Sequence, residues 1–171
     1  MDWEINRRGR VTYYRKKGNR LFSDLVVEAL DDGDLKIRFV GMTGARAATS
    51  ELGLSDTARM DPEREIPRTF DTWELYVRQA GICQSLADLD FLEVHAFGAA
   101  PKGPSPITDP VGFAAEKQRI RQAYSKAYAD YWERKMPGNG LPVRFTVYLE
   151  ELPDVDASYE LSAVALLQRK R

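Results

Sequence analysis

The feature that most constrains this chain is one long helix with strong start and stop signals. Asp109-Pro110 predicts its beginning, because aspartate accepts the free N–H groups of a first helical turn and proline fits the first helical position. Met136-Pro137-Gly138 predicts its end. The segment 110–135 between them would be about 39 Å long at 1.5 Å per residue. Its apolar stripe needs a broad surface to pack against, and a sheet can supply one.

Strands are predicted on both sides of this helix. In the first 40 residues, β-branched and aromatic segments alternate with turn residues, which is typical of an antiparallel meander, here of three strands. After the helix, Val143, Phe145, Val147 and Leu149 alternate with polar residues, and a second strand follows over 159–168. These two segments predict a C-terminal hairpin.

The middle of the chain is less regular. A second helix is predicted to begin at Asp71 and end at Gly81, and a strand over 91–97 follows it. Few large apolar residues and several glycines and prolines mark 41–68, which we expect to form a mobile arm, and 98–110 is a proline-rich loop. The fold class is therefore α+β. Residues 1–171 form a single domain: an antiparallel sheet, made of the meander and the hairpin, with one long amphipathic helix packed on a face.

The chain contains few residues suited to metal or nucleophilic chemistry. Cys83 is its one cysteine and His95 its one histidine, which excludes an internal disulfide and any metal site that needs several Cys or His ligands. We expect no cofactor and no metal, and no catalytic residue is assigned. One enzymatic alternative remains, a small hydrolase that uses Asp and Glu carboxylates with His95, because Glu93 lies two residues away on the same strand face.

Charge is unevenly distributed, although 25 basic and 26 acidic residues nearly cancel over the whole chain. The N-terminal 20 residues are strongly basic, whereas 149–160 carries acidic residues only. Tyrosine and tryptophan also crowd the second half of the long helix, and these residue types are common in binding hot spots. The predicted partner-binding residues are Arg7, Arg8, Arg10, Arg15, Lys16, Lys17, Tyr128 and Trp132.

These observations favour a non-catalytic interaction protein over an enzyme. The leading hypothesis is an assembly subunit that binds copies of itself or another protein through charged and aromatic surfaces. The first alternative is a nucleic-acid-binding protein that uses the basic N-terminal hairpin, and the second is the hydrolase. The N-terminus shows no signal-like apolar run and the longest apolar stretch, 161–167, is too short to span a bilayer, so we expect a cytoplasmic protein without membrane contact.

Overall fold

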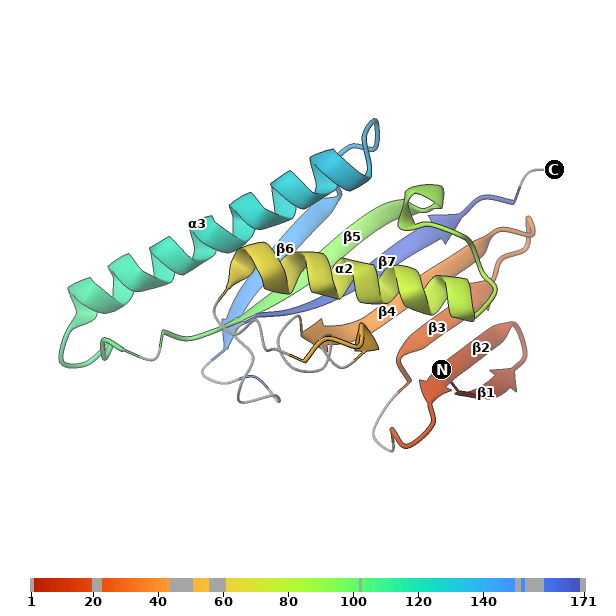
Figure 1. The fold of residues 1–171 in the computed structure, drawn as a ribbon, viewed down its shortest axis with the longest axis horizontal. Helices are drawn as coiled ribbons and strands as arrows, with labels where there is room; N and C mark the ends of the chain where they lie inside the picture. The colour runs from red at the N-terminus through yellow and green to blue at the C-terminus, as the bar shows by residue number, and fades with distance from the viewer. Residues whose placement is uncertain are drawn as a thin grey trace.

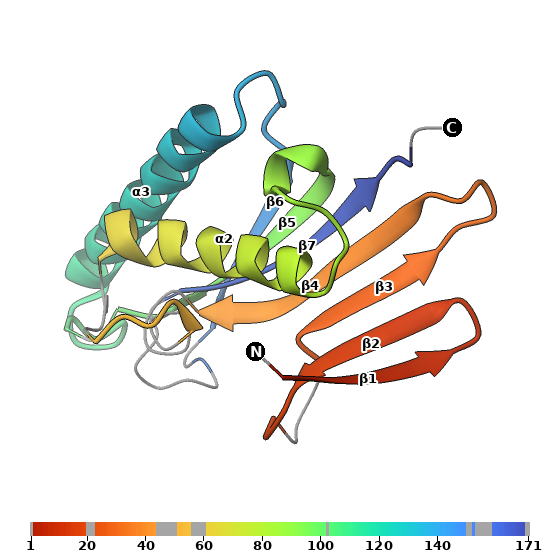
Figure 2. The same cartoon turned by 45° about the vertical axis from the view of Figure 1, so that its right-hand side comes forward.

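A computed structural model of the chain describes residues 2–19, 23–43, 51–55, 61–101, 103–149, 152 and 159–169. Within these residues the structure consists of one seven-stranded sheet with helices α2 and α3 on the same side of it (Figure 1; Figure 2). We call the opposite side of the sheet its open face.

The predicted N-terminal meander is present. It has four strands rather than the expected three, because residues 3–8 form an additional strand, and each strand is antiparallel to the next. They are β1 (Trp3–Arg8), β2 (Val11–Lys16), β3 (Leu25–Ala29) and β4 (Leu35–Thr43). In β4, apolar and polar residues alternate along the strand. As this alternation predicts, Leu35, Ile37 and Phe39 point into the core.

The expectation of a purely antiparallel sheet with a C-terminal hairpin is wrong. The remaining strands are β5 (Asp90–Ala99), β6 (Val143–Leu149) and β7 (Tyr159–Leu167), and the strand order is β1-β2-β3-β4-β7-β5-β6. β7 lies between β4 and β5 and is antiparallel to both, whereas β6 is an edge strand parallel to β5. The sheet is therefore mixed. The physical reason is the long helix, because a crossover connection returns the chain to the end of the sheet from which β5 started.

Two helices, rather than one, cover the sheet. The predicted long helix is α3 (Pro110–Lys135), and the Asp109 side chain caps it by accepting the N–H of Gly112 at 2.9 Å. The other is α2 (Pro62–Gln79), which begins well before the predicted start at Asp71. Asp71 lies inside α2, where its carboxylate accepts the hydroxyl of Tyr131 on α3 at 2.8 Å. A short 3-10 helix, η1 (Leu86–Asp88), follows α2.

The irregular segments are only partly described. In 41–68, which we expected to be an arm, residues 41–43 end β4 and residues 62–68 form the first turns of α2. Residues 44–50 and 56–60 lie outside the described part of the chain. In the proline-rich segment, 98 and 99 still belong to β5, and the described residues from 100 to 109 contain no helix or strand.

The core lies between the sheet and the two helices and is rich in aromatic rings. Phe39 of β4 stacks on Trp73 of α2 with ring centroids 4.8 Å apart. Phe70 of α2 stacks on Tyr131 of α3 at 4.9 Å. Burying each such ring contributes about 2–3 kcal/mol, so these contacts fix both helices on one side of the sheet.

Candidate interaction surface

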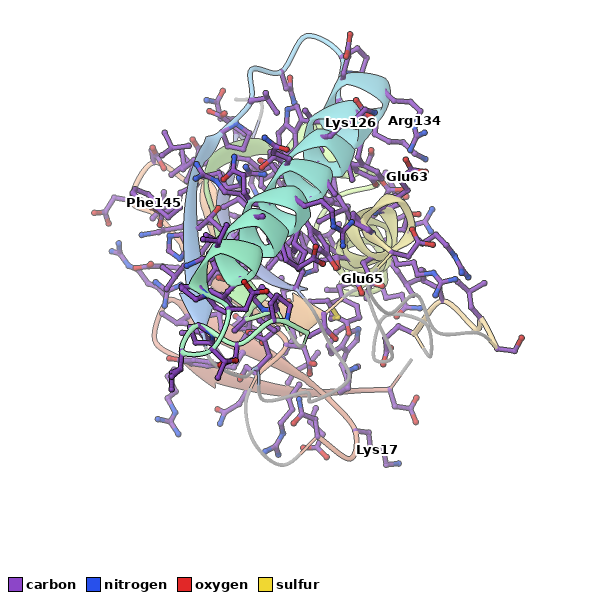
Figure 3. The ribbon with its side chains drawn as sticks, turned by 90° about the vertical axis from the view of Figure 1, so that its left-hand side faces the viewer. Lys17, Glu63, Glu65, Lys126, Arg134 and Phe145 are labelled. Atoms are coloured by element: carbon purple, nitrogen blue, oxygen red, sulfur yellow. The ribbon has the colours of Figure 1, made fainter. Side chains whose placement is uncertain are left out.

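Edge strand β6 has its polar side chains under α3 and its apolar side chains on the open face. The guanidinium of Arg144 donates to the hydroxyl of Ser125 on α3 at 2.6 Å. The ammonium group of Lys117, also on α3, lies 4.9 Å from the ring of Tyr148. Because successive strand residues point to opposite faces, the residues between and beside these two point away from α3. Figure 3 shows Phe145 on the side of β6 away from α3.

Four apolar side chains thereby form a row along β6, which we call the open-face row. Their exposed fractions lie between 39% and 61%. The members are Val143, Phe145, Val147 and Leu149. Isolated exposed apolar residues are ordinary on protein surfaces, whereas a contiguous row is a candidate interaction site.

The neighbouring strand widens this row. In the register of β5 with β6, His95 lies opposite Phe145 and Phe97 lies opposite Val147. The imidazole of His95 meets the Phe145 ring edge to face, with centroids 5.8 Å apart. Phe97 packs against the buried residues Ala99 and Leu152 but remains half-buried, so part of its side chain extends the apolar surface from the sheet edge onto β5.

Charged side chains of both signs lie on the same open face. Lys36 and Arg38 alternate with the core residues of β4 and therefore point to the open face. Glu28 pairs with Lys36 across the β3–β4 ladder, which places its carboxylate on that face as well. Glu93 of β5 lies beside the apolar surface. The open face thus combines an apolar edge with basic and acidic groups further across the sheet.

The predicted basic hairpin is present, but most of its charge is paired. Four of its six predicted binding residues lie within 4 Å of a carboxylate. The pairs are Arg10–Asp31, Arg15–Glu4, Lys16 with Asp24 and Glu51, and Lys17–Asp2. The pairing reduces the field that would attract phosphates, since opposite charges at this distance largely cancel. Arg7 and Arg8 point to opposite faces of β1, so they do not form one patch.

The structure places Tyr128 and Trp132 in the core rather than on the surface. Their exposed fractions are 4% and 2%. Both rings pack against Phe70 of α2, with centroids 5.9 Å away in each case. The helix contacts α2 as well as the sheet, and so it buries a broader face than the single stripe that its sequence indicates. A direct contact of these two residues with a partner is therefore incompatible with this packing.

The hydrolase alternative has one supporting contact. His95 Nε2 lies 3.5 Å from Glu93 Oε2, and both side chains are well exposed on the open face. Cys83 follows α2, and its burial, together with the nearby Asp88 carboxylate, raises the pKa of its thiol to about 11. At neutral pH this thiol is protonated and therefore a weak nucleophile.

Metal ligation and membrane insertion are two further possibilities. Within the described ranges, three or more His, Cys, Asp or Glu side chains nowhere gather in a way that could hold a metal ion. Neither α2 nor α3, the long helices that the structure describes, is apolar enough over sufficient length to cross a membrane.

Comparison with known proteins identifies the fold. No family model and no curated protein matches the sequence. Solved structures do match. Escherichia coli TdcF with bound serine is 15% identical, with a TM-score of 0.54, over 89% of this chain and 91% of that chain. The YjgF gene product of E. coli is 18% identical, with a TM-score of 0.54, over 90% and 91%. YyfA of Yersinia pestis, a member of the conserved Rid protein family, is 15% identical, with a TM-score of 0.51, over 86% and 89%.

These similarities show a fold class and nothing narrower. The chain has the α+β fold of the Rid and YjgF proteins, with its mixed sheet and two covering helices. At this level of identity the shared fold carries no activity with it, because one fold hosts many functions.

Proposed function

We propose that this protein is a non-catalytic assembly subunit that self-associates through the open face of its sheet. The observation that carries this proposal is the open-face row, whose four apolar side chains are between 39% and 61% exposed on β6. Burying apolar surface contributes about 25 cal/mol per Å², so covering this row stabilises an assembly.

The occupant of this face is a second copy of the same chain. In a two-fold contact each surface meets its own equivalent, so a patch has to be complementary to itself. The open-face row meets this condition because apolar groups pack against apolar groups. The charged part meets it because Lys36 and Arg38 of one copy can pair with carboxylates such as Glu28 of the other. The apolar character also fits homodimer interfaces, which are more apolar than interfaces between different proteins.

The test is the molecular mass of the purified protein in solution. Wild type is expected to run as a defined oligomer in light scattering after size exclusion, and Phe145→Lys as a monomer. The lysine would bury a charge in the contact, which costs far more than the lost apolar area. Val111→Lys on α3 is the matched control, because Val111 is also an exposed apolar residue but lies outside the open face.

The outcomes separate the alternatives. A wild-type protein that stays monomeric at high concentration contradicts self-association, even if it binds another protein. An oligomer that survives in Phe145→Lys but dissociates in Val111→Lys would place the contact elsewhere. Circular dichroism of both variants checks that each retains the wild-type fold.

A further inference from the structure

A separate cleft on the helix side of the sheet is lined by residues of the β1–β2 hairpin and of the turn after α2. Figure 1 shows this hairpin near the end of α2. α2 ends at Gln79, and Gly81 adopts a φ of 69°, a conformation that glycine accepts without strain. Ala80 and Gly81 form one wall of the cleft, and the inner face of the hairpin forms another. Its volume of ≈ 440 Å³ is within the range of small-molecule sites.

The cleft combines apolar lining residues with a basic rim. Tyr14, Val27, Leu35 and Ile82 are among its lining residues. Three arginines from distant parts of the sequence line the rim, and no acidic side chain is among the described lining residues. They are Arg7 of β1, Arg10 of the hairpin turn and Arg169 after β7.

Two of these three arginines carry charge that the described structure does not neutralise. Arg10 pairs with Asp31. The side chains of Arg7 and Arg169, by contrast, have neither an ion pair nor a hydrogen bond within the described part of the chain. The backbone N–H of Arg169 donates to Asp34 Oδ1 at 3.1 Å, which holds this residue at the rim.

We propose that this cleft binds a phosphate monoester with an apolar body. Guanidinium groups bind phosphate oxygens through two parallel hydrogen bonds, and two uncompensated positive charges match the charge of a monoester dianion. The apolar body would contact the apolar lining residues Tyr14 and Ile82. The proposal is independent of self-association, because the cleft and the open face lie on opposite sides of the sheet.

The probe is phenyl phosphate, titrated into the full-length protein by calorimetry in a phosphate-free buffer at pH 7.5. One binding site is expected, with at least tenfold higher affinity than for inorganic phosphate, which lacks the body, or phenol, which lacks the charge. Benzoate, which has the same ring with a single negative charge, is expected to bind at least threefold more weakly.

Two arginines that are adjacent in the sequence give a matched pair of variants. Arg7→Gln removes a charge from the cleft and is expected to weaken binding at least fivefold. Arg8→Gln removes the same charge from the opposite face of β1, where Arg8 lies over the Tyr13 ring, and is expected to change affinity less than twofold. Ala29→Trp fills the cleft from an exposed position without changing charge, and is expected to weaken binding at least tenfold.

Four results would overturn the proposal: no binding of phenyl phosphate, equal losses in Arg7→Gln and Arg8→Gln, unchanged affinity in Ala29→Trp, or benzoate binding as tightly as phenyl phosphate. Equal losses would indicate diffuse attraction to the basic hairpin. Because the oligomeric state is measured separately, failure here leaves the assembly proposal untouched.

Discussion

Two buried tyrosines on α3 differ in how their hydroxyl groups are satisfied. Tyr124 donates to Glu65 Oε2 of α2 at 2.6 Å, and both residues are buried. Tyr128 is equally buried, but its hydroxyl has no hydrogen-bond partner among the described residues. Tyr124→Phe is therefore expected to lower the free energy of unfolding by about 1–3 kcal/mol, because a buried carboxyl group loses a donor.

Tyr128→Phe serves as the matched control on the same helix. It removes a hydroxyl that is buried without a partner, so the free energy of unfolding is expected to change by less than about 0.5 kcal/mol or to rise. Urea unfolding followed by circular dichroism measures both variants. Equal destabilisation by the two substitutions would show that the Tyr124–Glu65 hydrogen bond contributes nothing specific.

The single thiol of the chain gives a prediction about pH. Burial, and then the Asp88 carboxylate, raise the pKa of Cys83 from an ordinary value of 9.0 to about 11. Thiolate, the reactive form, is therefore about a hundredfold scarcer at pH 7.5 than for an ordinary thiol. Greater intrinsic nucleophilicity offsets part of this, so iodoacetamide should alkylate native Cys83 at least about tenfold more slowly than the unfolded chain. The native rate should keep rising up to about pH 11; a plateau near pH 9 would contradict the shift.

Helix α2 contains a proline at an interior position, where the geometry of an α-helix does not favour proline. Pro67 lies inside the helix, where it lacks the N–H that would bond the carbonyl four residues earlier. Pro62 stands at the first helical position, where no such bond exists. Pro67→Ala is therefore expected to raise the free energy of unfolding by about 2 kcal/mol, after allowance for the freer unfolded chain.

Pro62→Ala is the control for this effect and is expected to leave stability unchanged or slightly lower. Thermal unfolding of both variants checks the difference. If Pro67→Ala destabilises the protein as well, the helix has adapted to the proline and the missing hydrogen bond is not a net cost.

Local sequence patterns predict most of the strands and helices, but they do not predict how these elements are arranged in the sheet. The meander and α3 follow from local signals, because alternation and caps act over a few residues. The predicted start of α2 at Asp71 is too late, because Pro62 and Pro67 indicate irregular structure in the sequence, whereas α2 begins at Pro62 and contains Pro67. The parallel pairing of β6 with β5 depends on where the crossover packs, which no local pattern contains.

The open-face row could likewise be predicted only in part from the sequence. The alternation of Val143, Phe145, Val147 and Leu149 identified a strand, but not which of its faces is covered. Arg144 and Tyr148 lie under α3 because that helix supplies Ser125 and Lys117 as polar neighbours, so the apolar set is left outside. The tyrosine and tryptophan residues of α3 indicate a binding surface in the sequence. In the structure, Tyr128 and Trp132 instead fill the contact between two helices.

At the scale of the whole molecule, a sheet with both helices on one side leaves its other face to be covered by association (Figure 2). An oligomer that forms only from folded chains gains stability with concentration by mass action. For a dimer of chains this size, a hundredfold rise in concentration should raise the unfolding temperature by about 4 °C. Calorimetric scans at several concentrations measure this shift. Phe145→Lys should unfold at one temperature throughout, since a monomer has no such dependence; a wild-type protein that also shows none would mean that the open face stays uncovered in solution.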